Sequence, residues 1–222
     1  MESMRHKQSG ITMAVKKVPL QTDGGRGSSH EMEKRMFCEL ETLRKTINSP
    51  NLISSYGSVF INNEVWIFME LMDISLEKMV EMMLMKEEQM PEWVVAHIAS
   101  AVTNALHHIH QMPGRATSSC NVKPSNILLS SAGKIKLTHC DTPIGILHLV
   151  YGHIQHPTKI YIAPERIDSS NPNKPADHRK NDIWSLGISL IEAATGVYPY
   201  SAGTVFEQLS QVTFTVVRLI LL

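Results

Sequence analysis

The sequence has 222 residues, 43% of them hydrophobic and 19% charged, and its 21 basic and 21 acidic side chains give a formal net charge of zero. This composition is that of a globular protein large enough to bury a core, and the lack of a basic excess argues against a nucleic-acid partner. Three cysteines without a CxxC spacing, no signal peptide and no apolar run long enough to span a bilayer lead us to expect a cytoplasmic protein without a membrane partner.

The first segment of the chain predicts two strands joined by a turn at Gln8–Ser9–Gly10. The second strand, Met13 to Val18, places Ala14 and Lys16 on one face. A lysine within an apolar strand is costly unless it meets an anion. The alternative is an edge-strand lysine that faces water, and the strand taken alone favours this alternative.

A helix and a hairpin follow. Ser28 and Glu31 form a capping box, and the helix carries apolar residues at helical spacing up to Ile47. Two strands, Val59–Ile61 and Val65–Phe68, then flank an Asn-Asn turn. The second strand runs into the sequence WIFMELM, in which isolated methionines would be interpreted as core filler.

Two helices come next, one starting at Ser75 and a longer one with Pro91 in its first turn. The apolar face of the longer helix contains Val95, Ile98, Val102, Leu106 and Ile109. Its last turn contains three histidines, His107, His108 and His110. A helix C-terminus favours such side chains, and no matching Cys/His ligand set lies nearby in the sequence, so we expect surface residues rather than a metal site.

The most informative stretch is Asn121–Leu129, NVKPSNILL, which is followed by SSAGKIKL. A polar loop with a Lys and an Asn, an apolar run, a Gly turn and a second strand form the pattern of a protein-kinase catalytic loop. Together with AVK, IAPERIDSSNP and NDIWSLGISLIEAATG, the form VKPSN resembles the MAP kinase kinases, and FEQLSQV resembles their stress-activated branch. The resemblance extends from Met4 to about Val212.

This resemblance implies an α+β, bilobal protein-kinase fold that is truncated at both ends. Residues 1–71 would form a β-rich small lobe lacking the Gly-rich loop, and residues 72–222 a mainly helical large lobe lacking its last helices. It also implies ATP and Mg²⁺ as cofactors, a MAP kinase as substrate or partner, and an upstream MAP kinase kinase kinase.

The resemblance assigns roles to individual residues. Lys16 would contact the α- and β-phosphates of ATP and pair with Glu39, with Glu41 as the competing register. Met69 would line the adenine pocket, while Glu70 and Met72 offer backbone groups to the base. Lys123 would contact phosphate, and Asn126 would serve as a metal ligand.

Several catalytic positions depart from the family pattern. Asn121 stands where the catalytic-base aspartate belongs, and loss of a general base costs roughly 10²–10⁴-fold in rate. Counting back from Ala163–Pro164–Glu165 without a gap places His139 at the Mg²⁺-binding aspartate, whereas a two-residue shift would place Asp141 there. The same count puts Leu149 and His153 where the family carries its phosphorylated Ser and Thr. Cys120 stands where an arginine belongs, and as a nucleophile it would need a histidine that the sequence cannot show.

In the last helix region we expect a buried stripe of Ile183, Leu186, Leu190 and Ala194, stopped by Gly196. By the resemblance Asp182 would hold the catalytic-loop backbone, and Trp184 would pack near the Ala163–Glu165 segment.

The favoured hypothesis is a MAP kinase kinase-like protein that transfers the ATP γ-phosphate to a MAP kinase, with activity weak or lost. The alternative is a pseudokinase that binds or scaffolds proteins of a MAP kinase pathway without phosphorylating them. A third possibility, suggested by the apolar tail VVRLILL, is a chain that does not fold alone.

Overall fold

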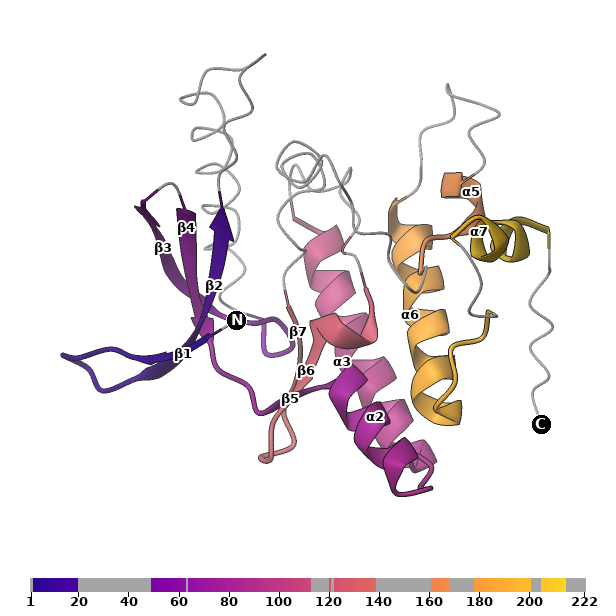
Figure 1. Cartoon of the computed structure of the whole chain (residues 1–222), viewed down its shortest axis with the longest axis horizontal. Coiled ribbons are helices and arrows are strands. Elements are labelled where there is room, and N and C mark those ends of the chain that lie inside the picture. Colours follow the sequence, from indigo (N-terminus) through magenta and orange to yellow (C-terminus); the bar gives the residue numbers. More distant parts are fainter. Residues whose placement is uncertain are drawn as a thin grey trace, which may run out of the picture.

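The computed structural model describes residues 2–19, 49–62, 64–112, 120, 122–138, 161–167, 178–200 and 205–214. A twisted antiparallel sheet forms one part of the molecule, and a group of helices forms the other (Figure 1). The expected α+β architecture with two parts is therefore confirmed.

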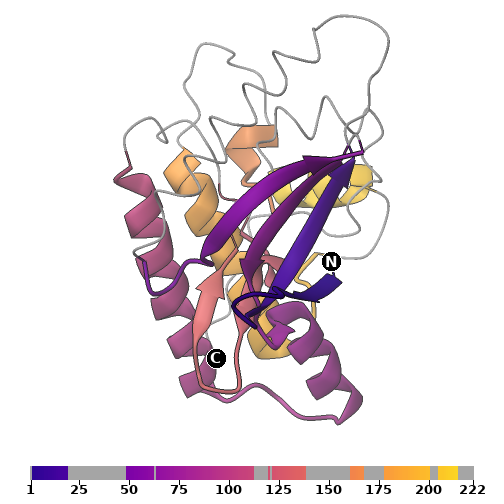
Figure 2. The ribbon, with the colours of Figure 1, turned by 90° about the vertical axis from the view of Figure 1, so that its left-hand side faces the viewer.

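The larger sheet has four strands in the order β1-β2-β4-β3, all antiparallel to their neighbours. The strands are β1 (Glu2–Arg5), β2 (Thr12–Pro19), β3 (Ser55–Ile61) and β4 (Glu64–Glu70). Both predicted turns are present, since Gly10 has φ +71° and Asn62 has φ +48°, the conformations that glycine and asparagine tolerate best. Figure 2 shows the twist of this sheet.

A second, smaller sheet lies between the larger sheet and the helices (Figure 1). Its strands are β5 (Ile74–Ser75), β6 (Ile127–Leu129) and β7 (Ile135–Leu137), in that order. The end of β7 is joined to the segment before β3, because the Leu137 N–H donates to the Asn51 carbonyl at 2.8 Å and the Ile53 N–H donates to the Leu137 carbonyl at 3.0 Å. These two bonds connect the small sheet to the segment that leads into the larger sheet.

Three helices supply most of the core: α2 (Leu76–Met85), α3 (Glu92–His110) and α6 (His178–Thr195). As predicted, Ser75 caps α2, with the Lys78 N–H donating to its hydroxyl at 3.2 Å. The remaining helices are η1 (Pro124–Asn126), α5 (Pro164–Ile167) and α7 (Val205–Phe214). In the described parts of the chain no helix is both long and apolar enough to cross a membrane.

The core between α2, α3, α6 and the small sheet is apolar. The expected face of α3 is confirmed in the main, with Ile98, Val102, Leu106 and Ile109 buried and Val95 partly buried. The other buried apolar residues of this core include Leu52, Leu76, Ile127, Leu137 and Leu186.

The buried face of α6 differs from the prediction. Of the expected apolar stripe, Leu186 is buried and Leu190 is partly buried against the core, but Ile183 is 54% exposed. The whole buried face carries mainly polar side chains alongside a few apolar ones: Asn181, Asp182, Ser185, Leu186, Ile188, Ser189, Glu192 and Ala193. Apolar periodicity fails here because hydrogen bonds to other segments satisfy these polar groups, so their burial is tolerated.

The segment that leads into α5 is attached to this polar face. The Tyr161 hydroxyl donates to Glu192 Oε2 at 2.5 Å, and the Ser185 hydroxyl lies 2.7 Å from the Tyr161 carbonyl. Burial, together with the Glu192 carboxylate, raises the pKa of Tyr161 far above its ordinary value, so the phenol remains a donor. Trp184 and Tyr161 both pack against one buried cluster of Ile188, Tyr200 and Val212.

Two glycines of α6 and its C-terminus provide a matched stability test. Gly196 ends the helix with φ +73°, and a Cβ there would lie 2.7 Å from Leu84 Cδ2, whereas a Cβ at Gly187 would meet nothing within 4 Å. We expect Gly196→Ala to lower the free energy of unfolding by about 1–2 kcal/mol, because an L-residue is strained in this region. Gly187→Ala should raise it by about 0.5–1 kcal/mol. Urea denaturation measures both, and shifts of the same sign would contradict the prediction.

Candidate functional site

A cavity of about 260 Å³ lies where the larger sheet meets the helical part. Met69, Glu70 and Met72, the three residues expected around a nucleotide base, all line it. The rest of the lining comes from both parts of the molecule: Ala14, Ile53, Leu71, Asp73, Ile74, Ser75, Ser125, Leu128 and Thr138. A mainly apolar cavity of this size suits a flat, weakly polar ring.

Lys16 lies on the same face of β2 as Ala14, because side chains alternate along a strand. Ala14 pairs with Met69 of β4, and Lys16 pairs with Ile67. Since Ala14 and Met69 line the cavity, this face of the sheet directs Lys16 toward the same side of the molecule.

Lys17, the next residue, lies on the opposite face. Its ammonium group is 2.8 Å from Glu2 Oε2 and 4.4 Å from the centre of the Trp66 ring. The two neighbouring lysines therefore have different environments, and only Lys16 shares the face of the cavity.

The predicted catalytic loop is held close to the cavity. Lys123 precedes η1, and the Asn126 N–H donates to the Lys123 carbonyl at 2.9 Å. Asn126 is 7% exposed, and its carbonyl accepts a hydrogen bond from the Thr138 N–H at 2.8 Å. Thr138 and Ser125 line the cavity, so Asn126, which is bonded to Thr138, lies beside it. Thr138 is also the residue before the predicted metal-binding segment.

Four other predicted site residues lie outside the described residues: Glu39, Asn121, His139 and Asp141. The pairing of Lys16 with Glu39, the position of the missing base and the choice between the two metal registers therefore stay predictions. Cys120 and Val122, on either side of Asn121, are both fully buried.

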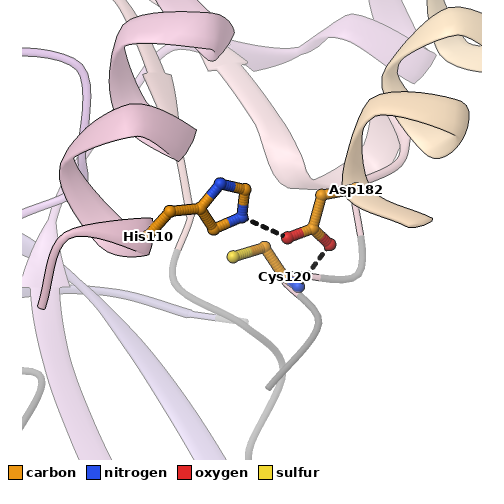
Figure 3. Close-up of side chains that lie close together, drawn as sticks. All are labelled: His110, Cys120 and Asp182. Atoms are coloured by element: carbon orange, nitrogen blue, oxygen red, sulfur yellow. Dashed lines mark hydrogen bonds and ion pairs between the residues drawn. The ribbon is translucent and has the colours of Figure 1, made fainter. Parts of the chain in front are cut away.

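A buried carboxylate anchors this loop. Asp182, with 0% of its side chain exposed, accepts a hydrogen bond from the Cys120 N–H at 2.8 Å through Oδ1. Its Oδ2 accepts a second hydrogen bond from His110 Nε2, also at 2.8 Å (Figure 3). The expected role of Asp182 is thus present, and the bond to His110 adds the end of α3 to the same anchor.

The expectation that all three histidines are surface residues is wrong for His110. Its side chain is only 15% exposed, whereas His107 is exposed and lies 3.0 Å from Gln111 Nε2. The error arises because the partner of His110 lies 72 residues away in the sequence, where helical spacing gives no signal.

The neighbouring residue of α6 holds the Ala163–Glu165 segment in the same way. Asn181 Oδ1 accepts a hydrogen bond from the Ala163 N–H at 2.9 Å, and both residues are buried. Two consecutive side chains at the start of α6 therefore position two segments that are far apart in the sequence.

Glu70 has a role that the sequence did not suggest. Its Oε2 lies 2.6 Å from Lys136 Nζ and 3.4 Å from the Ser54 N–H, so its side chain joins β4 to β7 at the edge of the cavity. Burial raises the pKa of Glu70, but the hydrogen bond and charge of Lys136 outweigh burial and lower the pKa overall. The side chain is thus occupied by a structural ion pair, and the Glu70 N–H donates to the Ser54 carbonyl at 2.9 Å.

The comparisons with known proteins agree with this geometry. A sequence model described as the protein kinase domain matches residues 2–220. The two-part fold, the cavity at the junction and the anchored loop thus define the class, and the chain belongs to the protein kinase family.

Two similar proteins are dual specificity mitogen-activated protein kinase kinases. The chain is 36% identical to the dual specificity mitogen-activated protein kinase kinase sek-1 of Caenorhabditis elegans over 214 residues, which cover 95% of this chain and 60% of the relative. It is also 36% identical to human dual specificity mitogen-activated protein kinase kinase 7 over 213 residues, covering 94% and 48%. Within the protein kinases the chain is thus similar to MAP kinase kinases over nearly its whole length. The chain spans about half to three fifths of their length.

Removing the Glu70 carboxylate tests the ion pair. We expect Glu70→Gln to lower the free energy of unfolding at pH 7 by about 1–3 kcal/mol, since Lys136 loses its charged acceptor. Because the folded pKa of Glu70 lies below its ordinary value of 4.5, this stabilisation is complete above that value and is lost as the pH falls through the folded pKa. Urea denaturation at several pH values should show the difference shrinking in acid. Glu81→Gln, which breaks an exposed pair with Lys78, should cost less than about 0.5 kcal/mol.

The two lysines of β2 test the nucleotide site. We expect ATP with Mg²⁺ to raise the melting temperature, since a ligand at a hundred times its dissociation constant stabilises a protein by about 2.7 kcal/mol. Lys16→Met should weaken ATP binding by roughly 10–100-fold, the value of a lost charge-assisted hydrogen bond. Lys17→Met, on the opposite face, should leave ATP binding unchanged. Equal effects of the two substitutions on the dissociation constant, measured by calorimetry, would contradict the assignment of Lys16.

Proposed function

We propose that this protein is a stress-activated MAP kinase kinase whose phosphoryl transfer is impaired. The observation that supports the proposal is the replacement of the catalytic-base aspartate by Asn121 within a loop whose neighbours are firmly held. Cys120 is bonded to Asp182, and Asn126 is bonded to Thr138 beside the cavity. The scaffold that would present a catalytic base is therefore kept, while the residue type that performs the chemistry is not.

The chemistry of the loop explains the impairment. In protein kinases an aspartate accepts the proton of the substrate hydroxyl as the γ-phosphoryl group is transferred. An asparagine amide does not accept a proton as a carboxylate does, and the loss of a general base costs roughly 10²–10⁴-fold in rate. Lys16 and Lys123 remain to neutralise phosphate charge, so we expect nucleotide binding to survive better than transfer.

The metal site is weakened in the same proposal. Mg²⁺, when bound, neutralises the charge of the phosphates, and it prefers oxygen ligands in an octahedral arrangement. The buried Asn126, next to the start of the segment after β7, offers one such oxygen. In the ungapped register the second ligand is His139, whose nitrogen suits Mg²⁺ poorly, and in the shifted register it is Asp141.

The partners follow from the family. We propose a MAP kinase as the substrate and a MAP kinase kinase kinase as the upstream activator, in the cytoplasm. The activation segment departs from the family pattern, since Leu149 and His153 carry no hydroxyl group to phosphorylate. This departure favours a second candidate, a pseudokinase that holds a MAP kinase or an upstream kinase without modifying it.

Restoring the two aspartates separates the candidates. The double variant Asn121→Asp/His139→Asp should phosphorylate an inactive MAP kinase roughly 10²–10⁴-fold faster than the unmodified chain, because it regains a base and a hard oxygen ligand. The rate is measured by transfer of labelled phosphate, with ATP binding and thermal melting recorded for every variant.

Asn62→Asp, in the exposed turn before β4, is the matched control for the added charge and should leave the rate unchanged. If the double variant folds and binds ATP but stays inactive, the impaired-kinase proposal is wrong and the pseudokinase candidate is favoured.

A further inference from the structure

Away from the nucleotide cavity, three ligand-type side chains converge on one point (Figure 3). They are His110 at the end of α3, Cys120 in the segment before η1, and Asp182 near the start of α6. One nitrogen, one sulfur and one carboxylate oxygen of these residues all lie within 4.8 Å of one another. Among the described residues, this is the group of histidine, cysteine and acidic side chains with the spacing of a metal site.

The group is buried and held from several directions. Cys120 and Asp182 are fully buried, and the side chain of His110 is 15% exposed. The Cys120 N–H and His110 Nε2 are each 2.8 Å from one oxygen of Asp182. Because hydrogen bonds and packing already fix the three side chains, little conformational entropy remains to be lost when they bind an ion.

We propose that these residues form a zinc site, with Cys120 Sγ, His110 Nε2 and Asp182 Oδ2 as ligands. Sulfur, imidazole nitrogen and carboxylate oxygen are the three donor types that Zn²⁺ takes in proteins, at about 2.0–2.3 Å. Tetrahedral coordination at these lengths places ligand atoms about 3.2–3.7 Å apart. The ligand atoms lie within 4.8 Å of one another, so the sulfur must approach by up to about 1.1–1.6 Å, and the 2.8 Å bond of His110 to Asp182 must open by about half an ångström.

The balance of charge favours this ion at a buried position. Zn²⁺ takes the place of the Cys120 thiol proton, which leaves to solvent, and the neutral ring of His110 carries its proton on Nδ1. The thiolate and the carboxylate together carry two negative charges, so the site with Zn²⁺ is neutral, and burial of a net charge is avoided. A water molecule would complete the tetrahedron as the fourth ligand.

The three ligand atoms also favour Zn²⁺ over Mg²⁺. Thiolate and imidazole are poor ligands for Mg²⁺ and good ligands for Zn²⁺, so this site is chemically distinct from that of Asn126. Bound zinc would join the catalytic-loop segment to α3 and α6 at the anchor of Asp182. This inference does not depend on whether the protein is an active kinase.

The experiment uses the cysteines of the chain. The sequence contains three, so the double variant Cys38→Ser/Cys140→Ser leaves Cys120 as its one thiol. Because Zn²⁺ has no visible spectrum of its own, Co²⁺ replaces it as the probe. We expect one equivalent of Co²⁺ to give a thiolate-to-cobalt charge-transfer band and the visible bands of tetrahedral cobalt, and Zn²⁺ to abolish both.

Substitutions identify the ligands. Adding Cys120→Ser to the double variant should remove the charge-transfer band, and His110→Gln should weaken Co²⁺ binding at least tenfold. His107→Gln, on the exposed side of the same helical turn, should leave the spectrum unchanged. A spectrum without a thiolate band in the double variant would overturn the proposal, as would an unchanged spectrum in a folded His110→Gln variant.

Where the ligand variants fail to fold, measurements on the Cys38→Ser/Cys140→Ser variant alone test the zinc site. Zn²⁺ should raise the melting temperature of this variant and slow the alkylation of Cys120. If neither changes at Zn²⁺ concentrations that displace Co²⁺, the metal is bound elsewhere and the proposal is wrong.

Discussion

The structure depends most on the buried carboxylate of Asp182. Each of its oxygens accepts a hydrogen bond, one from the Cys120 backbone and one from the His110 ring, and each bond is 2.8 Å long. A carboxylate without exposure is tolerated only when it is satisfied in this way, since an unpaired buried charge costs several kcal/mol (about 3–5 when one partner of a buried pair is removed). Loss of either partner therefore strains α3, α6 and the catalytic-loop segment together.

The polar face of α6 extends this principle along the helix. Asn181 holds Ala163, and both Ser185 and Glu192 hold Tyr161. Hydrophobic burial is non-directional and stabilises the core between α2, α3 and the small sheet, whereas hydrogen bonds fix geometry. In this protein the apolar core provides stability, and the hydrogen bonds of the polar face of α6 determine where the segments around the site lie.

The same distinction separates the parts of the site that are kept from those that are replaced. In the function that we propose, the strand lysine and the anchors of the loop keep their roles, and the departures fall on the residues that would handle protons and metal. A change of residue type at Asn121 alters chemistry without altering the hydrogen bonds of Cys120 and Asn126 on either side. A kinase scaffold can thus persist where phosphoryl transfer has weakened, because different atoms maintain structure and catalysis.

The sequence by itself determined the local features of this protein. Turn residues predicted both hairpins, Ser75 marked the start of α2, apolar spacing predicted most of the buried face of α3, and motif residues predicted the kinase family and the segment that lines the cavity, Met69, Glu70 and Met72. Only the tertiary structure decided that His110 meets Asp182, that Lys136 meets Glu70, and that α6 buries a polar face. These contacts join residues 72 and 66 positions apart, and local periodicity has no information at such separations. A hydrophobic pattern assigns a polar side chain to the surface, and the side chain is recognised as buried only when its hydrogen-bond partner is known.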